Sequence, residues 1–70
     1  MEYVVLIEKG SDGSFSAYVP DLPGCVSCGD TIAEVKGNIR EAVQLHIDSL
    51  RAHCEPVPPA TTTTDFVAVS

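Results

Sequence analysis

The sequence has few cations, no tryptophan and no long apolar run. Only four of its 70 residues are Lys or Arg, against ten Asp or Glu, and the formal net charge is −6. Such an acidic surface repels a phosphate backbone, so we expect no direct binding to nucleic acid by this chain alone. The charge favours a basic protein partner instead, because opposite charges accelerate encounter.

A membrane span and a targeting signal are also missing. The apolar run near the N-terminus covers only residues 3–7 and follows an acidic residue, Glu2, rather than a basic one. A helix that crosses a bilayer needs about 20 apolar residues, and a secretory signal begins with a basic region. The sequence therefore predicts a cytoplasmic protein without membrane contact.

Cysteine is scarce and odd in number: Cys25, Cys28 and Cys54. Without a secretory signal these residues are expected to be reduced thiols. Cys25 and Cys28 have metal-ligand spacing, and His53 and Cys54 follow downstream, so zinc is a weak candidate. Residues three apart on a strand point to opposite faces, however. We therefore interpret Cys25 and Cys28 as two small, half-buried side chains, and we predict no metal and no cofactor.

Hydrophobic patterning predicts a single domain, residues 1–70, of the α+β class. The expected order is β-β-β-α-β, with a small mixed sheet covered on one face by a single long helix. The third strand connects to the fourth through the helix, a crossover that is right-handed by strong preference. The expected elements are residues 3–7, 15–19, 25–28, 31–53 and 65–69.

The helix has a start signal and two distinct faces. Thr31 and Glu34 fit a capping box, with Thr31 as the N-cap. On a helical wheel one apolar face emerges, and an opposite polar face carries Glu34, Glu41, Gln44 and Asp48. The apolar face comprises Ile32, Val35, Ile39, Ala42, Val43, His46 and Leu50. One helix covers only one face of the sheet, so the other face is either an exposed apolar patch or is covered by another subunit.

The sequence favours neither of two kinds of catalysis. Metal-dependent cleavage of RNA needs clustered carboxylates, and nothing in the sequence forces Glu8, Glu41 and Asp65 to converge. His46 lies in the apolar stripe without a neighbouring nucleophile, which favours a packed histidine over a general base. The sequence therefore predicts a protein that is not an enzyme.

Several motifs together resemble the HicB antitoxin family. These are the N-terminal hairpin, the Tyr-Val-Pro-Asp-Leu-Pro-Gly-Cys segment at 18–25, Gly-Asp-Thr at 29–31, and a helix with Asn38-Ile39 and Glu41-Ala42. The resemblance implies a degraded RNase H-like fold without nuclease chemistry. It also implies a small basic HicA-type toxin that cleaves mRNA as partner, and a homo-oligomer, dimer or tetramer. With 70 residues, the chain is expected to be the short form, without the C-terminal DNA-binding domain of longer members.

The alternative is an orphan HicB-like domain with no toxin, acting as an oligomeric structural or regulatory protein. For either reading the sequence suggests three sets of residues. Two loop residues each have two interpretations. Asp21 either fixes the turn by accepting hydrogen bonds from backbone N–H groups or contacts a partner. Leu22 is either buried under the helix or projects into a partner. The predicted sets are a structural loop (Pro20, Asp21, Pro23, Gly24), partner-binding positions (Glu34, Glu41, Asp48, Leu22, Leu45) and a self-associating segment (Phe66, Val67, Val69).

Overall fold

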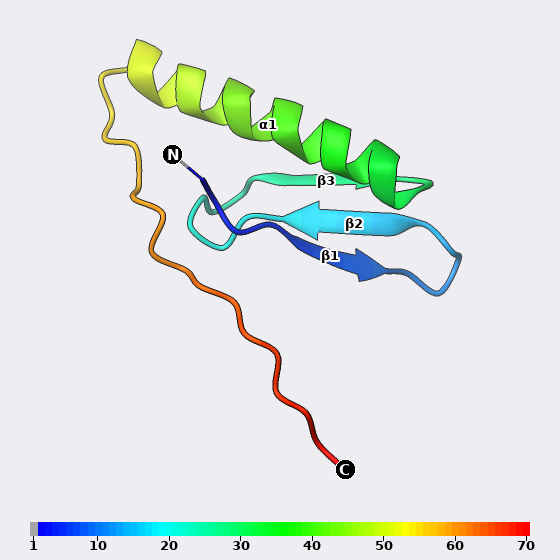
Figure 1. The fold of residues 1–70 in the computed structure, drawn as a ribbon. Coiled ribbons are helices and arrows are strands. Elements are labelled where there is room, and N and C mark those ends of the chain that lie inside the picture. Colours follow the sequence, from blue (N-terminus) through cyan, green and yellow to red (C-terminus); the bar gives the residue numbers. More distant parts are fainter. Residues whose placement is uncertain (1) are drawn as a thin grey trace.

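The computed structural model describes residues 2–70 as a three-stranded sheet and one helix in two layers (Figure 1). The strands are β1 (Leu6–Lys9), β2 (Phe15–Tyr18) and β3 (Val26–Gly29), and the helix is α1 (Ile32–Ala52). All strand pairs are antiparallel, in the order β1-β2-β3. The predicted α+β class, with one long helix on one face of a sheet, is confirmed.

A compact turn joins β1 to β2. Gly13 has φ of 88°, a left-handed conformation that glycine adopts without steric cost. The Asp12 carboxylate accepts hydrogen bonds from the Ser14 hydroxyl (2.7 Å) and the Ser14 N–H (3.0 Å). These two bonds, the hydroxyl bond above all, lower the pKa of Asp12. The turn sets the register in which Ile7 lies opposite Ala17.

Alternation along the strands divides the sheet into two faces. Ala17 is 1% exposed and faces α1, so its cross-strand partners Ile7 and Ser27 lie on the same face. The β2–β3 loop adds Val19, Leu22 and Cys25 to this side, and α1 adds Val35, Ile39 and Ile47. Leu22 and Val35 are wholly buried at the centre of this core.

The helix begins and ends as its sequence signals predict. The Thr31 hydroxyl oxygen accepts a hydrogen bond from the Glu34 N–H at 3.1 Å, which is the first of the two bonds of a capping box. His53 forms the C-cap. The predicted apolar face is correct for Val35 and Ile39 but wrong for Ile32, which is 52% exposed. Ile32 lies in the first turn of α1, directly after the β3–α1 connection. The sheet has already ended there, so it does not cover the Ile32 side chain.

The strand β3 approaches the helix more closely than the other strands do. A Cβ atom on Gly29 would lie 2.7 Å from the backbone nitrogen of Val35, so only glycine fits there without movement. The side-chain amide of Asn38 donates a hydrogen bond to the carbonyl oxygen of Cys28 at 2.9 Å. These contacts hold α1 above the β3 side of the sheet and leave β1 as the opposite edge (Figure 1).

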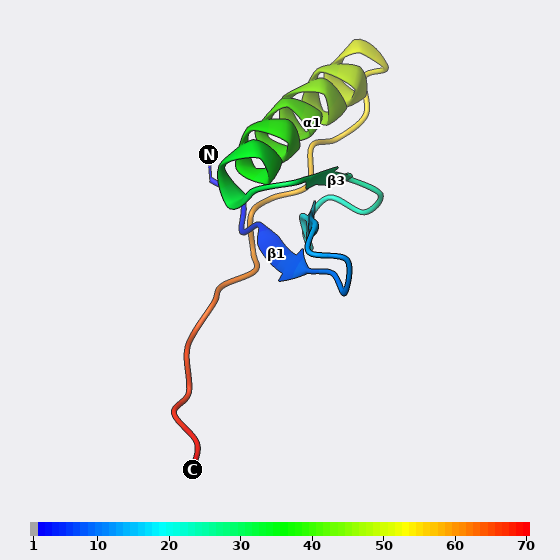
Figure 2. The same ribbon diagram turned by 90° about the vertical axis from the view of Figure 1, so that its right-hand side faces the viewer.

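The fourth strand is absent from the described residues, and this corrects the sequence-based prediction. Residues 55–70 form neither helix nor strand, and after Thr62 the segment leaves the two-layer body (Figures 1 and 2). Phe66, Val67 and Val69 are 96%, 80% and 89% exposed. A strand needs a neighbouring strand for its backbone hydrogen bonds, so an apolar alternating pattern alone does not create one. The sheet is therefore antiparallel with three strands, not mixed with four.

The first strand also begins later than predicted. Leu6 pairs with Tyr18, the last residue of β2, and the chain then turns away at Pro20. Residues 3–5 consequently have no ladder partner and lie outside β1. They still place Tyr3 and Val5 against the core, and the Tyr3 hydroxyl donates a hydrogen bond to the carbonyl oxygen of Pro58.

Candidate functional site

The outer face of α1 carries a line of acidic side chains. Glu34, Glu41 and Asp48 are seven residues apart, so they lie nearly above one another on the helix, and all three are exposed. The Gln44 side-chain amide donates a hydrogen bond to Asp48 at 2.9 Å. These three residues are called the acidic stripe below. The structure brings the predicted acidic positions together on one surface.

The two apolar residues predicted to bind a partner differ in their surroundings. Leu45 is 64% exposed and lies on α1 close to the acidic stripe. Leu22 is 0% exposed and belongs to the core, so it has no surface to offer a partner. The structure therefore supports the buried alternative for Leu22 and corrects its assignment as a contact residue.

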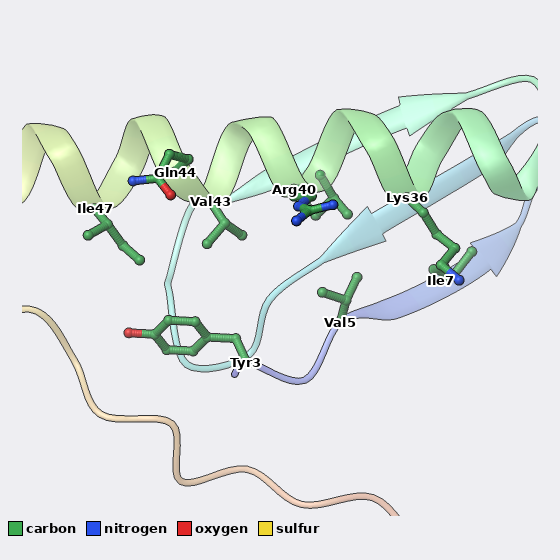
Figure 3. A pocket seen from close by; sticks show the side chains of 9 residues that line it. Tyr3, Val5, Ile7, Lys36, Arg40, Val43, Gln44 and Ile47 are labelled. Carbon is green, nitrogen blue, oxygen red and sulfur yellow. The ribbon is translucent and has the colours of Figure 1, made fainter. Parts of the chain in front are cut away.

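A groove of about 410 Å³ runs between α1 and the β1 edge (Figure 3). It exists because α1 packs on β3 and β2, which leaves the helix-facing side of β1 uncovered. Figure 3 shows the side chains of Val43 and Ile47 descending from the helix, with Tyr3 and Val5 on the opposite wall. Two cationic residues, Lys36 and Arg40, also line the groove. Ile39 and Val43 belong to the predicted apolar face of the helix, but the groove beside them was not predicted, because only the packing of α1 to one side of the sheet opens it.

The sheet face away from the helix carries a row of apolar residues. Leu6 pairs with Tyr18, and Tyr18 pairs with Val26, so the three side chains form one line across all three strands. Tyr18 is 38% exposed and Val26 is 65% exposed. Among residues 2–70 no element covers this row. Of the two alternatives predicted for this face, the single chain shows an exposed apolar patch.

Asp21 has a role that sequence reasoning did not foresee. Its carboxylate accepts four hydrogen bonds: from the backbone N–H groups of Thr61 (3.0 Å) and Thr62 (2.9 Å), and from their hydroxyls (3.1 and 2.8 Å). The predicted turn is instead closed by backbone bonds, such as Cys25 N–H to Leu22 carbonyl at 3.0 Å, with Gly24 at φ 83°. Asp21 thus ties the C-terminal segment to the β2–β3 loop, a pairing 40 residues apart that no local pattern reveals.

We predict that this tie depends on pH. The bonds from Thr62 and Thr61, led by the Thr62 N–H, lower the pKa of Asp21 below its ordinary value of 3.8. A carboxyl with a lowered pKa stabilises the folded state above its unfolded pKa, and this contribution disappears as pH falls through the folded pKa. Amide hydrogen exchange at Thr61 and Thr62 should therefore be slow at neutral pH and become faster only as pH falls below 3.8, after correction for intrinsic rates.

Asp21→Asn is expected to accelerate exchange at Thr61 and Thr62 severalfold at neutral pH, because an amide has one acceptor oxygen and no charge. Asp30→Asn is the matched control, since Asp30 is an exposed carboxylate at the connection between β3 and α1 and takes no part in the tie. Equal protection of Thr61 and Thr62 in wild type and Asp21→Asn would contradict the assigned tie.

The three cysteines differ in their exposure to solvent. Cys25 is 4% exposed, and burial raises the pKa of its thiol, whereas Cys28 and Cys54 are exposed. All three thiols are free.

Within residues 2–70 no group of three or more His, Cys, Asp or Glu side chains is arranged to hold a metal ion. Glu8, Glu41 and Asp65 are spread over β1, α1 and the C-terminal segment, and His46 is half-buried on α1. No helix in the described part of the chain is long and apolar enough to cross a bilayer.

These features define a small α+β domain with several surfaces suited to binding another protein. Comparison with known proteins is specific: residues 3–69 match the family model described as HicB-like antitoxin of bacterial toxin-antitoxin systems. The chain belongs to the HicB-like antitoxin family. Membership implies a toxin as partner in general terms, and it favours a role without catalysis.

Individual relatives agree with this assignment. The chain is 52% identical over 56 residues to a UPF0150 protein of Synechocystis sp., covering 80% of this chain and 71% of the relative. It is 45% identical over 58 residues to a UPF0150 protein of Thermoplasma acidophilum, covering 83% and 84%. The crystal structure of the N-terminal domain of the Burkholderia pseudomallei antitoxin HicB superposes with a TM-score of 0.81 at 33% identity, covering 90% of this chain and 74% of that one.

Proposed function

We propose that this chain is an antitoxin that binds and neutralises a small basic HicA-type toxin that cleaves mRNA. The observation that carries the proposal is the fold match to the N-terminal domain of an antitoxin HicB at a TM-score of 0.81. In this proposal the chain acts in the cytoplasm by complex formation, without catalysis, cofactor, membrane contact or direct contact to nucleic acid. Occupying the toxin's active site is sufficient for inhibition, so the antitoxin needs affinity rather than chemistry.

Charge supports a basic partner and suggests where it binds. The acidic stripe places three carboxylates on one exposed face of a chain with net charge −6. Leu45 adds an exposed apolar side chain to the same region. Exposed charges mainly raise the association rate with an oppositely charged protein, whereas a desolvated apolar anchor lowers the dissociation rate. In this proposal the stripe and Leu45 together form the surface that docks a basic toxin.

The proposal is tested by searching for a short basic protein encoded beside this chain's gene and purifying it. The pure basic protein should cleave mRNA, and a stoichiometric amount of this chain should suppress the cleavage. The triple variant Glu34→Gln, Glu41→Gln, Asp48→Asn should lower the association rate constant about tenfold at low salt, and the loss should shrink at high salt.

A matched variant separates the stripe from net charge. Glu2→Gln, Glu8→Gln, Glu55→Gln removes three exposed carboxylates elsewhere, so it changes the net charge equally. Equal losses in both variants would show that net charge alone steers the partner. Absence of any neighbouring toxin, or failure to suppress cleavage, would favour the orphan-domain alternative.

Self-association is the second part of the proposal. Phe66, Val67 and Val69 are the predicted contact residues, and each is at least 80% exposed in the single chain. Exposed apolar residues in one short segment are a common sign of a protein interface. We propose that this segment contributes to a homo-oligomer, a dimer or tetramer.

A further inference from the structure

The strand β1 is an open edge. It pairs with β2 on one side, and no strand within residues 2–70 pairs with its other side. The opposite edge, β3, also lacks a second strand, but α1 lies close to it: the Asn38 amide bonds to the Cys28 carbonyl, and the helix backbone approaches Gly29. An exposed edge strand offers unpaired backbone N–H and C=O groups to any extended segment that reaches it.

Beside this edge lies the groove, which is apolar where a fourth strand would place its side chains. Tyr3, Val5 and Ile7 alternate along the chain and face the helix, and Val43 and Ile47 form the facing wall (Figure 3). Ile39 of α1 lines the groove as well. A strand added to β1 would present every second side chain to this space. The edge and the groove are therefore one continuous acceptor for an extended apolar segment.

The chain itself contains such a segment. Residues 65–69 alternate, so that Phe66 and Ala68 lie on one face of an extended strand and Val67 and Val69 on the other. The segment is extended and almost fully exposed, and it leaves the body after the hydrogen bonds that tie Thr61 and Thr62 to Asp21 (Figure 1). It does not line its own groove. Since it already points away from its own domain, it can reach a neighbouring molecule without refolding.

Charge is complementary between the segment and the acceptor. Lys36 and Arg40, two of only four cationic residues in the chain, line the groove. Figure 3 shows the Lys36 side chain extending from α1 toward Ile7 on β1. The segment carries an acid, Asp65, at its start. An otherwise acidic chain thus places cations beside the acceptor, which favours an acidic apolar strand over a basic one.

We propose that residues 65–69 of a second copy add to the edge of β1 as a fourth strand, with the apolar side chains of one strand face in the groove and Asp65 near Lys36 and Arg40. Two copies exchange their segments reciprocally, as in domain-swapped dimers. The inference rests on the self-association proposed above and not on the presence of a toxin.

Complementation between two full-length variants tests the exchange. The tail variant Phe66→Asp, Val67→Asp has a defective segment and an intact acceptor. The acceptor variant Lys36→Glu, Arg40→Glu has an intact segment and a reversed charge in the groove. Light scattering during size exclusion should give wild type twice the 7.4 kDa chain mass and each variant once that mass. Mixing the two variants one to one should restore a dimer, because one good segment meets one good acceptor.

Two controls change charge outside the proposed contact: the tail control adds the same two negative charges as the tail variant, and the helix control reverses one cation. Thr63→Asp, Thr64→Asp adds two acids to the tail before residues 65–69, and Arg51→Glu reverses a cation at the far end of α1. Both controls should remain dimeric. Adding Asp65→Lys to the acceptor variant should restore its dimer by reversing both partners. All substituted positions except Val67 and the Phe66 ring are polar and every one is exposed, so the fold is retained, which circular dichroism verifies.

Several outcomes would overturn the proposal. A tail variant that stays dimeric would place the interface elsewhere, for example on the Leu6–Tyr18–Val26 row. A monomeric wild type whose Val67 amide is protected from exchange would show that the segment folds onto its own β1. An acceptor variant that stays dimeric, or mixed variants that stay monomeric, would reject exchange at the groove. A monomeric variant that still neutralises the toxin would leave the antitoxin proposal intact.

Discussion

Leu22→Ala is expected to lower the free energy of unfolding by about 2–5 kcal/mol, the range for removing a buried leucine side chain. Leu22 is 0% exposed, and it packs in a core whose buried members within residues 2–70 number only seven. A domain of this size has a total stability on the order of 5–15 kcal/mol or less. We therefore expect Leu22→Ala to remove a large fraction of the total stability of the domain.

The position of Leu22 explains why the loss should be large. The loop between β2 and β3 turns inward at Leu22 and is closed by backbone bonds to Val19 and Cys25 (Leu22 N–H to Val19 carbonyl, 3.1 Å). Truncating the side chain leaves a cavity next to Val35, the other wholly buried side chain of the core. Collapse into that cavity is limited because the loop is held by its own hydrogen bonds.

Urea denaturation followed by circular dichroism measures the effect. Leu45→Ala is the matched control, because Leu45 is 64% exposed on α1 and the substitution removes the same atoms. Leu45→Ala should change the free energy of unfolding by less than about 0.5 kcal/mol. If the two variants lost equal stability, the placement of Leu22 in the core would be wrong.

Gly29→Ala is the second substitution with a large expected effect. The added Cβ would lie 2.7 Å from the backbone nitrogen and 3.0 Å from the Cα of Val35. These are backbone atoms in the first turns of α1, so a side-chain rotation cannot relieve the overlap. The helix must shift away from β3, and overpacking of this kind costs about 1–3 kcal/mol.

Gly37→Ala provides the opposite control within the same helix. A Cβ at Gly37 meets nothing within 4 Å, and alanine is the better helix former by up to about 1 kcal/mol. We expect the melting temperature to fall for Gly29→Ala and to rise for Gly37→Ala. A neutral Gly29→Ala would mean that α1 is not held against β3 as the structure has it.

The local signals of the sequence were reliable where neighbouring residues determine the outcome. The helix start at Thr31, its end near His53, and the hairpin turn around Gly13 depend on residues within a few positions of one another. Caps and turns satisfy backbone groups over short ranges, so their residues can be recognised without a three-dimensional structure. The family resemblance rested on the same local motifs, and the match over residues 3–69 confirms it.

Residues whose role depends on distant parts of the chain were less predictable. Asp21 binds Thr61 and Thr62 rather than its own turn. The segment 65–69 has the alternation of a strand but no strand beside it in the single chain. Hydrogen bonding in a sheet belongs to a pair of segments, so the pattern of one segment alone does not establish it.

The class of fold, the bounds of the helix, the acidic stripe and the family can be predicted from the amino-acid sequence, because periodicity, caps and motifs depend on residues that are near one another in the chain. The burial of Leu22, the bonds from Asp21 to the C-terminal segment and the groove between α1 and β1 follow only from the packed structure. The physical reason is the position of one helix on a sheet wider than itself. Packing α1 against β3, where Gly29 permits close approach, necessarily leaves the β1 edge uncovered.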